Sequence, residues 1–188
     1  MLNQIVQAQY QCTDGGSGVA SCSGTVANGA AINTSILGSQ TFSVSATDNV
    51  GNGSNGSAGY SVAYAASGMC YGDIGHQILQ PINADGTSVW KQGSTIPAKF
   101  RVCGANGVSV GTTGVVSSLY LTKIISGTVT TVDETVSSTT PDAVFRWDST
   151  NQQWIFNIST KSLTANNTYV YTITLNDGTT IVFQYGLK

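Results

Sequence analysis

Apolar residues recur at every second position in several short segments of this chain, and this period of two limits the fold more than any other feature. In residues 95–103 the residues on one side are Ile96, Ala98, Phe100 and Val102. Residues 169–175 and 181–187 alternate in the same way on either side of an Asn-Asp-Gly turn. This period is that of a half-buried strand. Because no segment carries a helical period of any length, we expect an all-β chain of antiparallel sheets packed face to face.

Composition narrows the class of protein further. Only 9% of the 188 residues are charged and the formal net charge is −2, so we expect no nucleic-acid partner. No apolar run approaches the roughly 18 residues of a membrane-spanning helix, and we expect no membrane insertion. No signal peptide precedes the strand pattern at residues 4–12, and we interpret Met1 as a fragmentary start. This mixture is typical of secreted β-proteins.

The four cysteines predict two disulfide bonds rather than a metal site. Zinc sites use closely spaced pairs, whereas this chain has no Cys-x-x-Cys and its only histidine is His76. Disulfides indicate an oxidising compartment, and we expect a secreted or cell-surface protein. Three pairings are possible, and we favour Cys12–Cys22 and Cys70–Cys103 because each bond then stays within one half of the chain.

The second half contains a motif around its clearest strand. Residues 89–100 read Val-Trp-Lys-Gln-Gly-Ser-Thr-Ile-Pro-Ala-Lys-Phe and resemble the signature of the PxKF domain of bacterial secreted proteins. Pro97, Lys99 and Phe100 lie in the tetrad that gives the family its name, and the resemblance continues through 145–148 and 154–163 to the C-terminus. It implies a β-sandwich module over residues 69–188 and names no reaction.

The period of two also predicts the individual strands of this module. Pro97 cannot donate to a strand ladder, so we expect its strand to lie at an edge or to begin unpaired. Lys99, Arg101 and Cys103 are predicted on the outer face. The predicted strands are 69–74, 86–92, 95–103, 107–111, 115–126, 128–134, 143–148, 152–159, 167–176 and 179–187.

The first half resembles the bacterial immunoglobulin-like repeats related to the HYR group. The resemblance rests on Tyr-Gln-Cys-Thr-Asp-Gly-Gly-Ser-Gly-Val-Ala-Ser-Cys at 10–22 and on Ala-Thr-Asp-Asn-Val-Gly-Asn at 46–52. Such repeats begin with a further strand that is absent here. The resemblance therefore implies a module over residues 1–65 that is truncated at its N-terminal strand.

The complete chain is thus predicted to form two tandem immunoglobulin-like antiparallel β-sandwiches, at 1–65 and 69–188, joined by a short linker. In the first module the strand patterns lie at 4–12, near 20–26, at 40–47 and near 60–64. The inward residues of 4–12 are predicted to be Val6, Ala8, Tyr10 and Cys12. The glycine-rich residues 53–59 are predicted to form a flexible loop.

Residue types that carry catalysis do not gather in any recognisable pattern. His76 has no paired nucleophile, and there is no Gly-x-Ser-x-Gly segment. Asp85, Asp148 and Asp177 lie in turn sequences, where an aspartate side chain bonds its own backbone. We therefore predict that the module is not an enzyme.

Calcium is the metal that the sequence favours, and we predict no other cofactor. Asp14 follows the first strand pattern and Asp48 and Asn52 follow the strand pattern at 40–47, so all three could offer oxygen ligands at one end of the module. The alternative is that these residues only build turns, because calcium takes six to eight oxygens and few carboxylates are at hand.

Two further side chains carry weaker hypotheses. Lys99 would cross-link to an asparagine or aspartate only if it were buried beside an acid, and its alternation places it outward. Trp147 is a candidate for stacking on a sugar ring, whereas Trp154 alternates with Phe156 and Ile158 and is predicted in the core.

These observations predict a structural spacer or adhesion module of a larger bacterial secreted or surface protein. The alternative is an accessory module that binds carbohydrate or another cell-surface ligand. The expected partners are adjacent domains of the parent chain and a cell-surface glycan or protein. A homodimer is also predicted through the open edge of residues 1–65, since an uncovered strand edge invites pairing.

Overall fold

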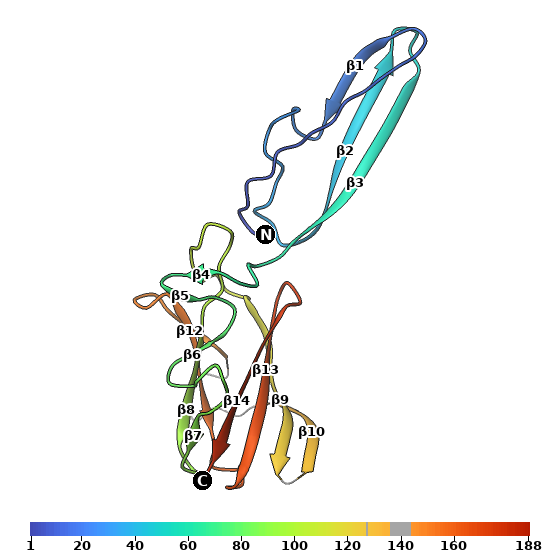
Figure 1. The fold of residues 1–188 in the computed structure, drawn as a ribbon. Helices are drawn as coiled ribbons and strands as arrows, with labels where there is room; N and C mark the ends of the chain where they lie inside the picture. Colours follow the sequence, from blue (N-terminus) through green and yellow to red (C-terminus); the bar gives the residue numbers. More distant parts are fainter. Residues whose placement is uncertain (127, 136–143) are drawn as a thin grey trace. The chain divides into compact units, whose positions relative to one another are not determined.

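The computed structural model describes residues 1–126, 128–135 and 144–188, with side chains for 1–126 and 144–188. These residues form strands, turns and bends without a helix, and none of them makes a helix able to cross a membrane. The chain divides into two compact units, which we call unit 1 (Met1–Tyr64) and unit 2 (Ala65–Lys188). Figure 1 shows both in ribbon form. The predicted all-β class with antiparallel sheets is confirmed.

Unit 1 is built on one antiparallel sheet of three strands in the order β1-β2-β3. The strands are β1 (Val19–Gly24), β2 (Gly38–Asp48) and β3 (Gly53–Val62). In β2 the apolar residues Phe42, Val44 and Ala46 alternate with exposed polar ones, as a half-buried strand requires. A turn at 48–52 then returns the chain, so that β3 pairs with β2 from Thr47↔Gly53 to Gly38↔Val62.

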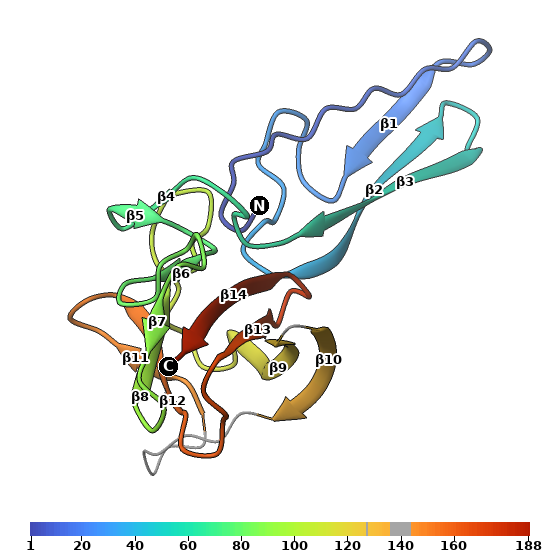
Figure 2. The same cartoon turned by 60° about the horizontal axis from the view of Figure 1, so that its bottom comes forward.

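Three predictions for unit 1 were wrong, and one of them is Val6, which was predicted inward and is exposed. Residues 53–59 are not a loop: they belong to β3, because the turn at 48–52 places their backbone in register with β2. Residues 4–12 are not a ladder strand, since their only bridge is Gln7↔Ala31. We call residues 4–13 the N-terminal segment; it runs along the sheet in both views (Figures 1 and 2).

Unit 2 contains two larger sheets and a small hairpin. One sheet has the order β10-β9-β13-β14-β7 and the other the order β11-β12-β8-β6, while β4 pairs only with β5. All pairs are antiparallel except β14 with β7. The strands are β4 (Met69–Cys70), β5 (Asp73–Ile74), β6 (Ile78–Leu79), β7 (Val89–Trp90), β8 (Thr95–Phe100), β9 (Val116–Ser126), β10 (Thr128–Thr135), β11 (Arg146–Asp148), β12 (Gln153–Ser159), β13 (Asn167–Leu175) and β14 (Thr180–Leu187).

Alternate residues of β8, β12, β13 and β14 form the core of unit 2. Tyr169, Tyr171 and Tyr185 are among its largest fully buried side chains. The Tyr185 hydroxyl donates a 3.0 Å hydrogen bond to that of Tyr171, and burial raises the pKa of Tyr185 far above its usual value. The remaining buried residues of these four strands are Ile96, Ala98, Phe100, Trp154, Phe156, Ile158, Ile173, Leu175, Ile181, Phe183 and Leu187.

The predicted strand at 95–103 ends earlier than its sequence pattern. β8 stops at Phe100, and Arg101 and Cys103 are buried rather than outward. The cause is local, because Cys103 is tied into a disulfide and Arg101 is bonded to neighbouring loops. Residues 107–111 form no strand, and only a bridge joins Cys103 to Ser109.

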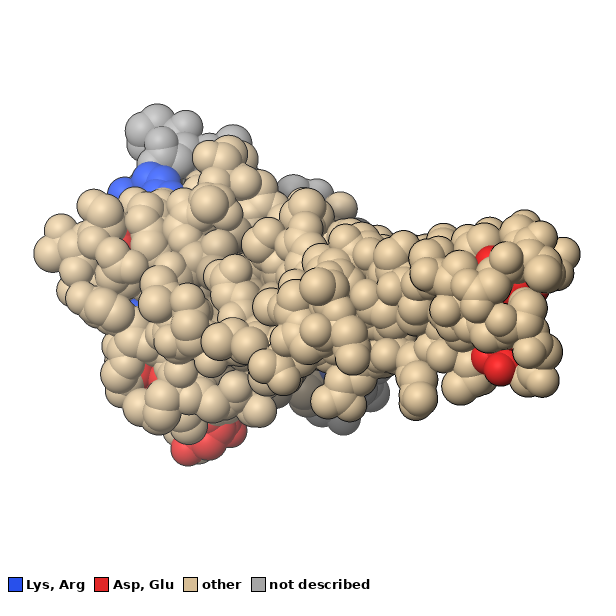
Figure 3. Space-filling view, turned by 90° about the horizontal axis from the view of Figure 1, so that it is seen from above, with Lys and Arg blue, Asp and Glu red and all other residues tan. Residues whose placement is uncertain are grey.

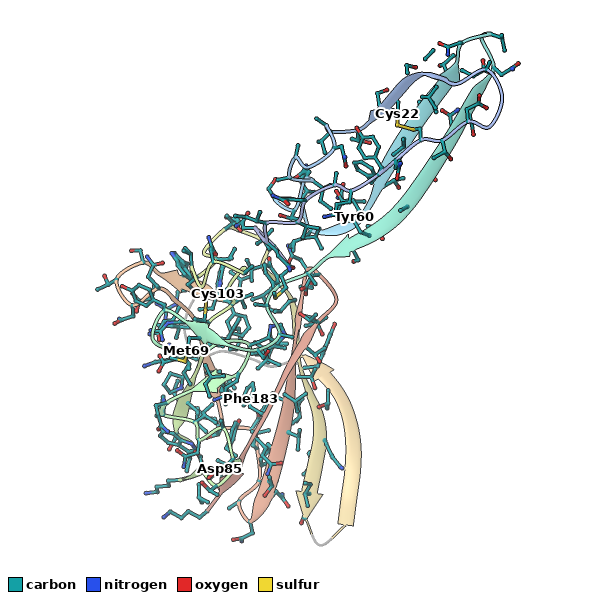
Figure 4. All side chains as sticks on the ribbon, turned by 45° about the horizontal axis from the view of Figure 1, so that its top comes forward. Cys22, Tyr60, Met69, Asp85, Cys103 and Phe183 are labelled. Atoms are coloured by element: carbon teal, nitrogen blue, oxygen red, sulfur yellow. A yellow bond between two sulfur atoms is a disulfide. The ribbon has the colours of Figure 1, made fainter. Side chains whose placement is uncertain are left out.

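Each unit contains one disulfide bond. Cys12 bonds to Cys22 in unit 1 and Cys70 bonds to Cys103 in unit 2, so that no cysteine is free. Figure 4 shows both bonds, beside the labels of Cys22 and Cys103. The first ties the N-terminal segment to β1, and the second ties the β4 hairpin to the chain after β8. Two disulfides indicate an oxidising, extracellular environment.

Candidate functional site

Unit 1 has a groove between the N-terminal segment and β3. It has a volume of about 480 Å³ and is lined by residues 9–13 on one side and 54–58 on the other. Phe42, Val44 and Ala46 of β2 form its floor. We call this feature the unit 1 groove. Its lining residues carry no charge, and charged side chains are also sparse on the face shown in Figure 3.

Backbone groups along one edge of the N-terminal segment lack partners. Ala8 donates to the Ala30 carbonyl and accepts from the Gly29 N–H, and the Tyr10 N–H donates to the Asn28 side chain. Successive residues of an extended chain point their backbone groups to opposite sides. The groups of Gln9 and Gln11 therefore face the other way, and none of the hydrogen bonds within fully described unit 1 uses them.

The three residues of the predicted calcium site lie around one small hollow. Asp14, Asp48 and Asn52 line a space of about 150 Å³ at the end of the sheet. Their own loops, however, already occupy Asp14 Oδ2 and both carboxylate oxygens of Asp48. Asp14 Oδ2 accepts from the N–H groups of Gly16 and Gly18, at 3.2 Å and 2.6 Å.

Asp48 shows the same occupation by its own loop. Its Oδ1 accepts from the Val50 and Asn52 N–H groups, and its Oδ2 accepts from Asn52 Nδ2 at 2.8 Å. The bond from the Asn52 side chain is the main cause that lowers the pKa of Asp48. The described residues contain no cluster of three or more histidine, cysteine or acidic side chains able to hold a metal. The arrangement is explained by turns, and the calcium site stays a prediction.

Three other aspartates hold turns, as their sequence context predicted. Asp85 and Asp177 each accept from the N–H and hydroxyl of a threonine two positions later. Asp148 accepts from the backbone of Thr150 and Asn151 and from the Asn151 side chain. These bonds lower the pKa of Asp85 and of Asp148, with the side-chain donor the largest cause in each.

The residues of the PxKF tetrad lie on β8. Phe100 is fully buried, and its ring packs edge-on against Phe145 with centroids 5.3 Å apart. Lys99 is partly exposed and lies between Ile155 of β12 and Leu79 of β6. Pro97 is opposite Asn157 on β12, while β6 reaches only the end of β8. Pro97 thus lies where one side of β8 is unpaired, as its missing N–H requires.

Arg101 is a structural residue that the period of two did not reveal. Its side chain is buried, forms an ion pair with Asp73, and donates to the carbonyls of Asn151 and Gln152. The guanidinium also lies over the Tyr71 ring, 5.3 Å from its centroid. This side chain therefore joins the β4–β5 hairpin to the β11–β12 turn. In the sequence, the only signal for this role is that Arg101 lies two positions before Cys103.

Trp147 packs within unit 2 and is half-buried. Its ring centroid lies 5.4 Å from that of Trp154, its partner across β11 and β12. A Cβ at Gly111 would come within 2.2 Å of the Trp147 ring, so Gly111 leaves room for it. Trp154 is buried as predicted and donates from Nε1 to the Val110 carbonyl. One side of the Trp147 ring is thus used for packing.

A second concave feature, on unit 2, carries amide side chains. It has a volume of about 360 Å³, and its polar side chains are Asp73, Gln77, Gln80 and Gln153. We call it the glutamine groove. His76 lies nearby in sequence, in a turn with φ of 61°. Burial lowers the pKa of His76.

Comparisons with known proteins reveal no family. No family model matches the chain, and no curated protein matches it. Among solved structures, a mixed-linkage-glucan utilisation protein of Bacteroides ovatus, in complex with a mixed-linkage heptasaccharide, is similar at 12% identity and a TM-score of 0.23. An endo-fucoidan hydrolase of glycoside hydrolase family 107 is similar at 14% identity and a TM-score of 0.22.

These two matches cover most of this chain but little of the other proteins. They span 85% and 91% of the present residues, yet only 35% and 28% of the respective chains. At these TM-scores the likeness carries no argument about function.

Proposed function

We propose that this chain is a non-catalytic structural or adhesion segment of a larger bacterial secreted or surface protein. Unit 1 would be an HYR-related immunoglobulin-like module over residues 1–65, and unit 2 a PxKF-type sandwich over 69–188. The observation that carries the proposal is that each compact unit has its own sheets and its own disulfide. β-Modules that are each cross-linked by a disulfide bond are consistent with an extracellular spacer.

The engagement of the acidic side chains supports the non-catalytic part of the proposal. A general acid or base needs a pKa near the working pH and must reach the proton that it transfers. Here Asp14, Asp48, Asp85, Asp148 and Asp177 all accept hydrogen bonds from their own turns. Bonds of this kind fix loops and leave the carboxylates as structural acceptors.

A mechanical experiment tests the spacer function. We expect the oxidised chain, pulled between its ends, to show two unfolding events, one for each unit. The disulfide of unit 2 closes a sequence separation of 33, so reduction should lengthen that unit's event by about 110 Å at 3.3–3.6 Å per residue. Extension without any force peak would contradict a mechanical role as a spacer.

Glycan binding is the second candidate function, and the glutamine groove is the observation that favours it. Its amide and carboxyl groups can bond sugar hydroxyls, as the polar groups of binding pockets do. A glycan array of the full chain tests it, with Gln77→Ala in the groove and Trp147→Ala outside it. Binding lost only in Gln77→Ala would support this site, whereas no binding would remove the candidate.

A further inference from the structure

We propose that the unit 1 groove is a strand-addition site. Its occupant is an extended, uncharged polypeptide strand from outside residues 1–188, with small apolar side chains at alternate positions. This strand would lie over β3 beside the N-terminal segment. The inference goes beyond the spacer function and does not depend on it.

The unpaired backbone edge is the first reason. Gln9 and Gln11 both line the groove, and none of their backbone N–H and C=O groups has a partner within unit 1. Two residues along an extended chain give a repeat of about 6.6 Å. A polypeptide strand is the ligand whose donors and acceptors recur at that spacing, so its ladder bonds would satisfy this edge.

The floor of the groove gives the second reason. Phe42, Val44 and Ala46 point into it from alternate positions of β2, and all three remain partly exposed. Their partners on β3 are Ala58, Gly56 and Ser54, which are too small to cover them. Alternate apolar side chains of an added strand would bury this row, and burial of apolar surface is favourable.

The lining sets the chemistry of the occupant. None of the residues 9–13 and 54–58 carries a charge, so a charged side chain on the inner face would lose its water without gaining an ionic partner. Gly56 has nothing within 4 Å of the position of a Cβ. The inner residues of the added strand are therefore apolar, and the space above β3 admits branched aliphatic side chains.

A second copy cannot provide this strand from its own N-terminal segment. That segment is fixed over β1 and β2, because Cys12 bonds to Cys22 and the Tyr10 ring lies 5.8 Å from that of Phe42. In unit 2, the alternating apolar residues of β8, β12, β13 and β14 already lie in the core. The homodimer predicted from the sequence is the alternative that the experiments below distinguish from an added strand.

A synthetic peptide of alternating threonine and valine, with a lysine at each end for solubility, is the probe. We expect it to bind the full chain and to slow amide hydrogen exchange at Gln9 and Gln11 by at least about tenfold. Two N-methylated isomers, blocked at all valines or at all threonines, are the matched peptides. One isomer should lose binding and the other should keep it, since only one edge of the peptide faces the N-terminal segment.

Two variants test the groove from different sides. Gly56→Leu fills the space above β3 and should weaken peptide binding at least about tenfold. Its control is Gly59→Leu on the opposite face of β3, where a Cβ would make only an ordinary contact of 3.9 Å. Gln11→Pro removes an unpaired N–H and should also weaken binding, whereas Gln11→Ala keeps that N–H and should bind normally.

Several outcomes would overturn the proposal. They are no binding of the peptide at millimolar concentration, equal binding of both N-methylated isomers, or full binding to Gly56→Leu and Gln11→Pro. A dimer that forms without peptide and is lost in Gly56→Leu would assign the groove to a second copy instead. Displacement of the peptide by soluble glucan oligosaccharides would assign it to a glycan. These results do not depend on the outcome of the mechanical unfolding experiment that tests the spacer function.

Discussion

Unit 1 and unit 2 share a β architecture and a disulfide, but they bury very different amounts of apolar surface. The buried apolar residues of unit 1 are Leu2, Ala8, Val62 and Tyr64. In unit 2 whole faces of β8, β12, β13 and β14 are buried, with three tyrosines among the largest fully buried side chains. Pairing of strands does not by itself form a core; a core forms where the inward faces of two sheets are both buried.

This difference follows from what each sheet has to pack against. The inner face of unit 1 meets the N-terminal segment, which is tied to β1 by the Cys12–Cys22 bond and leaves the groove over β3. In unit 2 the inward faces of β8, β12, β13 and β14 are buried. Small units with little core depend on cross-links for stability. We infer that unit 1 relies on its disulfide and ladder bonds, and unit 2 on its core.

The largest expected effect comes from removing one aromatic ring from each unit. Phe100→Ala should destabilise unit 2 by about 3–5 kcal/mol, because its ring is fully buried. Phe42→Ala should cost unit 1 only about 1–2 kcal/mol, since that ring is partly exposed. Denaturant unfolding with a probe in each unit measures both. Equal losses, or a Phe100→Ala melting temperature close to that of the parent, would contradict the difference in burial.

Loss of a disulfide should affect unit 1 more than unit 2, the reverse of the effect of removing an aromatic ring. In the loop-closure description, the bonds spanning separations of 33 and 10 contribute about 4 and about 3 kcal/mol. Replacing Cys12 and Cys22 by alanine should unfold much of unit 1 and leave unit 2 intact. Replacing Cys70 and Cys103 should lower the melting temperature of unit 2 without unfolding it. Two-dimensional NMR distinguishes these results, and a folded unit 1 without its bond would show that its core suffices.

Acid should weaken the turns of both units to a smaller extent. The pKa values of Asp48, Asp85 and Asp148 are lowered from 3.8 by hydrogen bonds in the folded state. A lowered folded-state pKa gives stability that is present above pH 4 or so and is lost as the pH falls through the folded value. We expect urea midpoints to be level near neutrality and to fall below about pH 4. Asp148→Asn should flatten that fall; an unchanged slope would contradict the role of this turn.

Calcium should have the smallest effect. Because loop donors already occupy Asp14 Oδ2 and both oxygens of Asp48, we expect no change in melting when calcium is added to EDTA-treated protein. Asp85→Asn is a suitable control at a distant turn. A melting shift that is abolished by Asp48→Asn but not by Asp85→Asn would establish the calcium site predicted from the sequence.

The sequence predicted those parts whose inward residues are large and apolar. The β13–β14 hairpin is the clearest case, since its alternation and Asn-Asp-Gly turn agree with the observed register from Asn167↔Leu187 to Thr174↔Thr180. The first part of β3, residues 53–59, escaped prediction because its inner residues are Ser54, Gly56 and Ala58, which give no hydrophobic period. Its pairing is set by the backbone ladder, which leaves no trace in side-chain pattern.

The site residues show the same limit of prediction from the sequence. The sequence placed Asp14, Asp48 and Asn52 at one end of the first module, and the structure brings them around one hollow. It could not show that loop donors occupy Asp14 Oδ2 and both oxygens of Asp48. The period of two placed Arg101 outward, because the pattern cannot reveal Asp73 and the carbonyls that compensate a buried guanidinium.

Residue-level hydrogen exchange on the oxidised full chain tests the contrast between the units most directly. We predict that amides of β8, β12, β13 and β14 exchange only through global opening of unit 2. Amides of β1 and β3 should exchange faster by orders of magnitude, because the thin core of unit 1 opens at lower free energy. Uniform protection across both units would contradict the claim that unit 1 is the incompletely covered and less stable one.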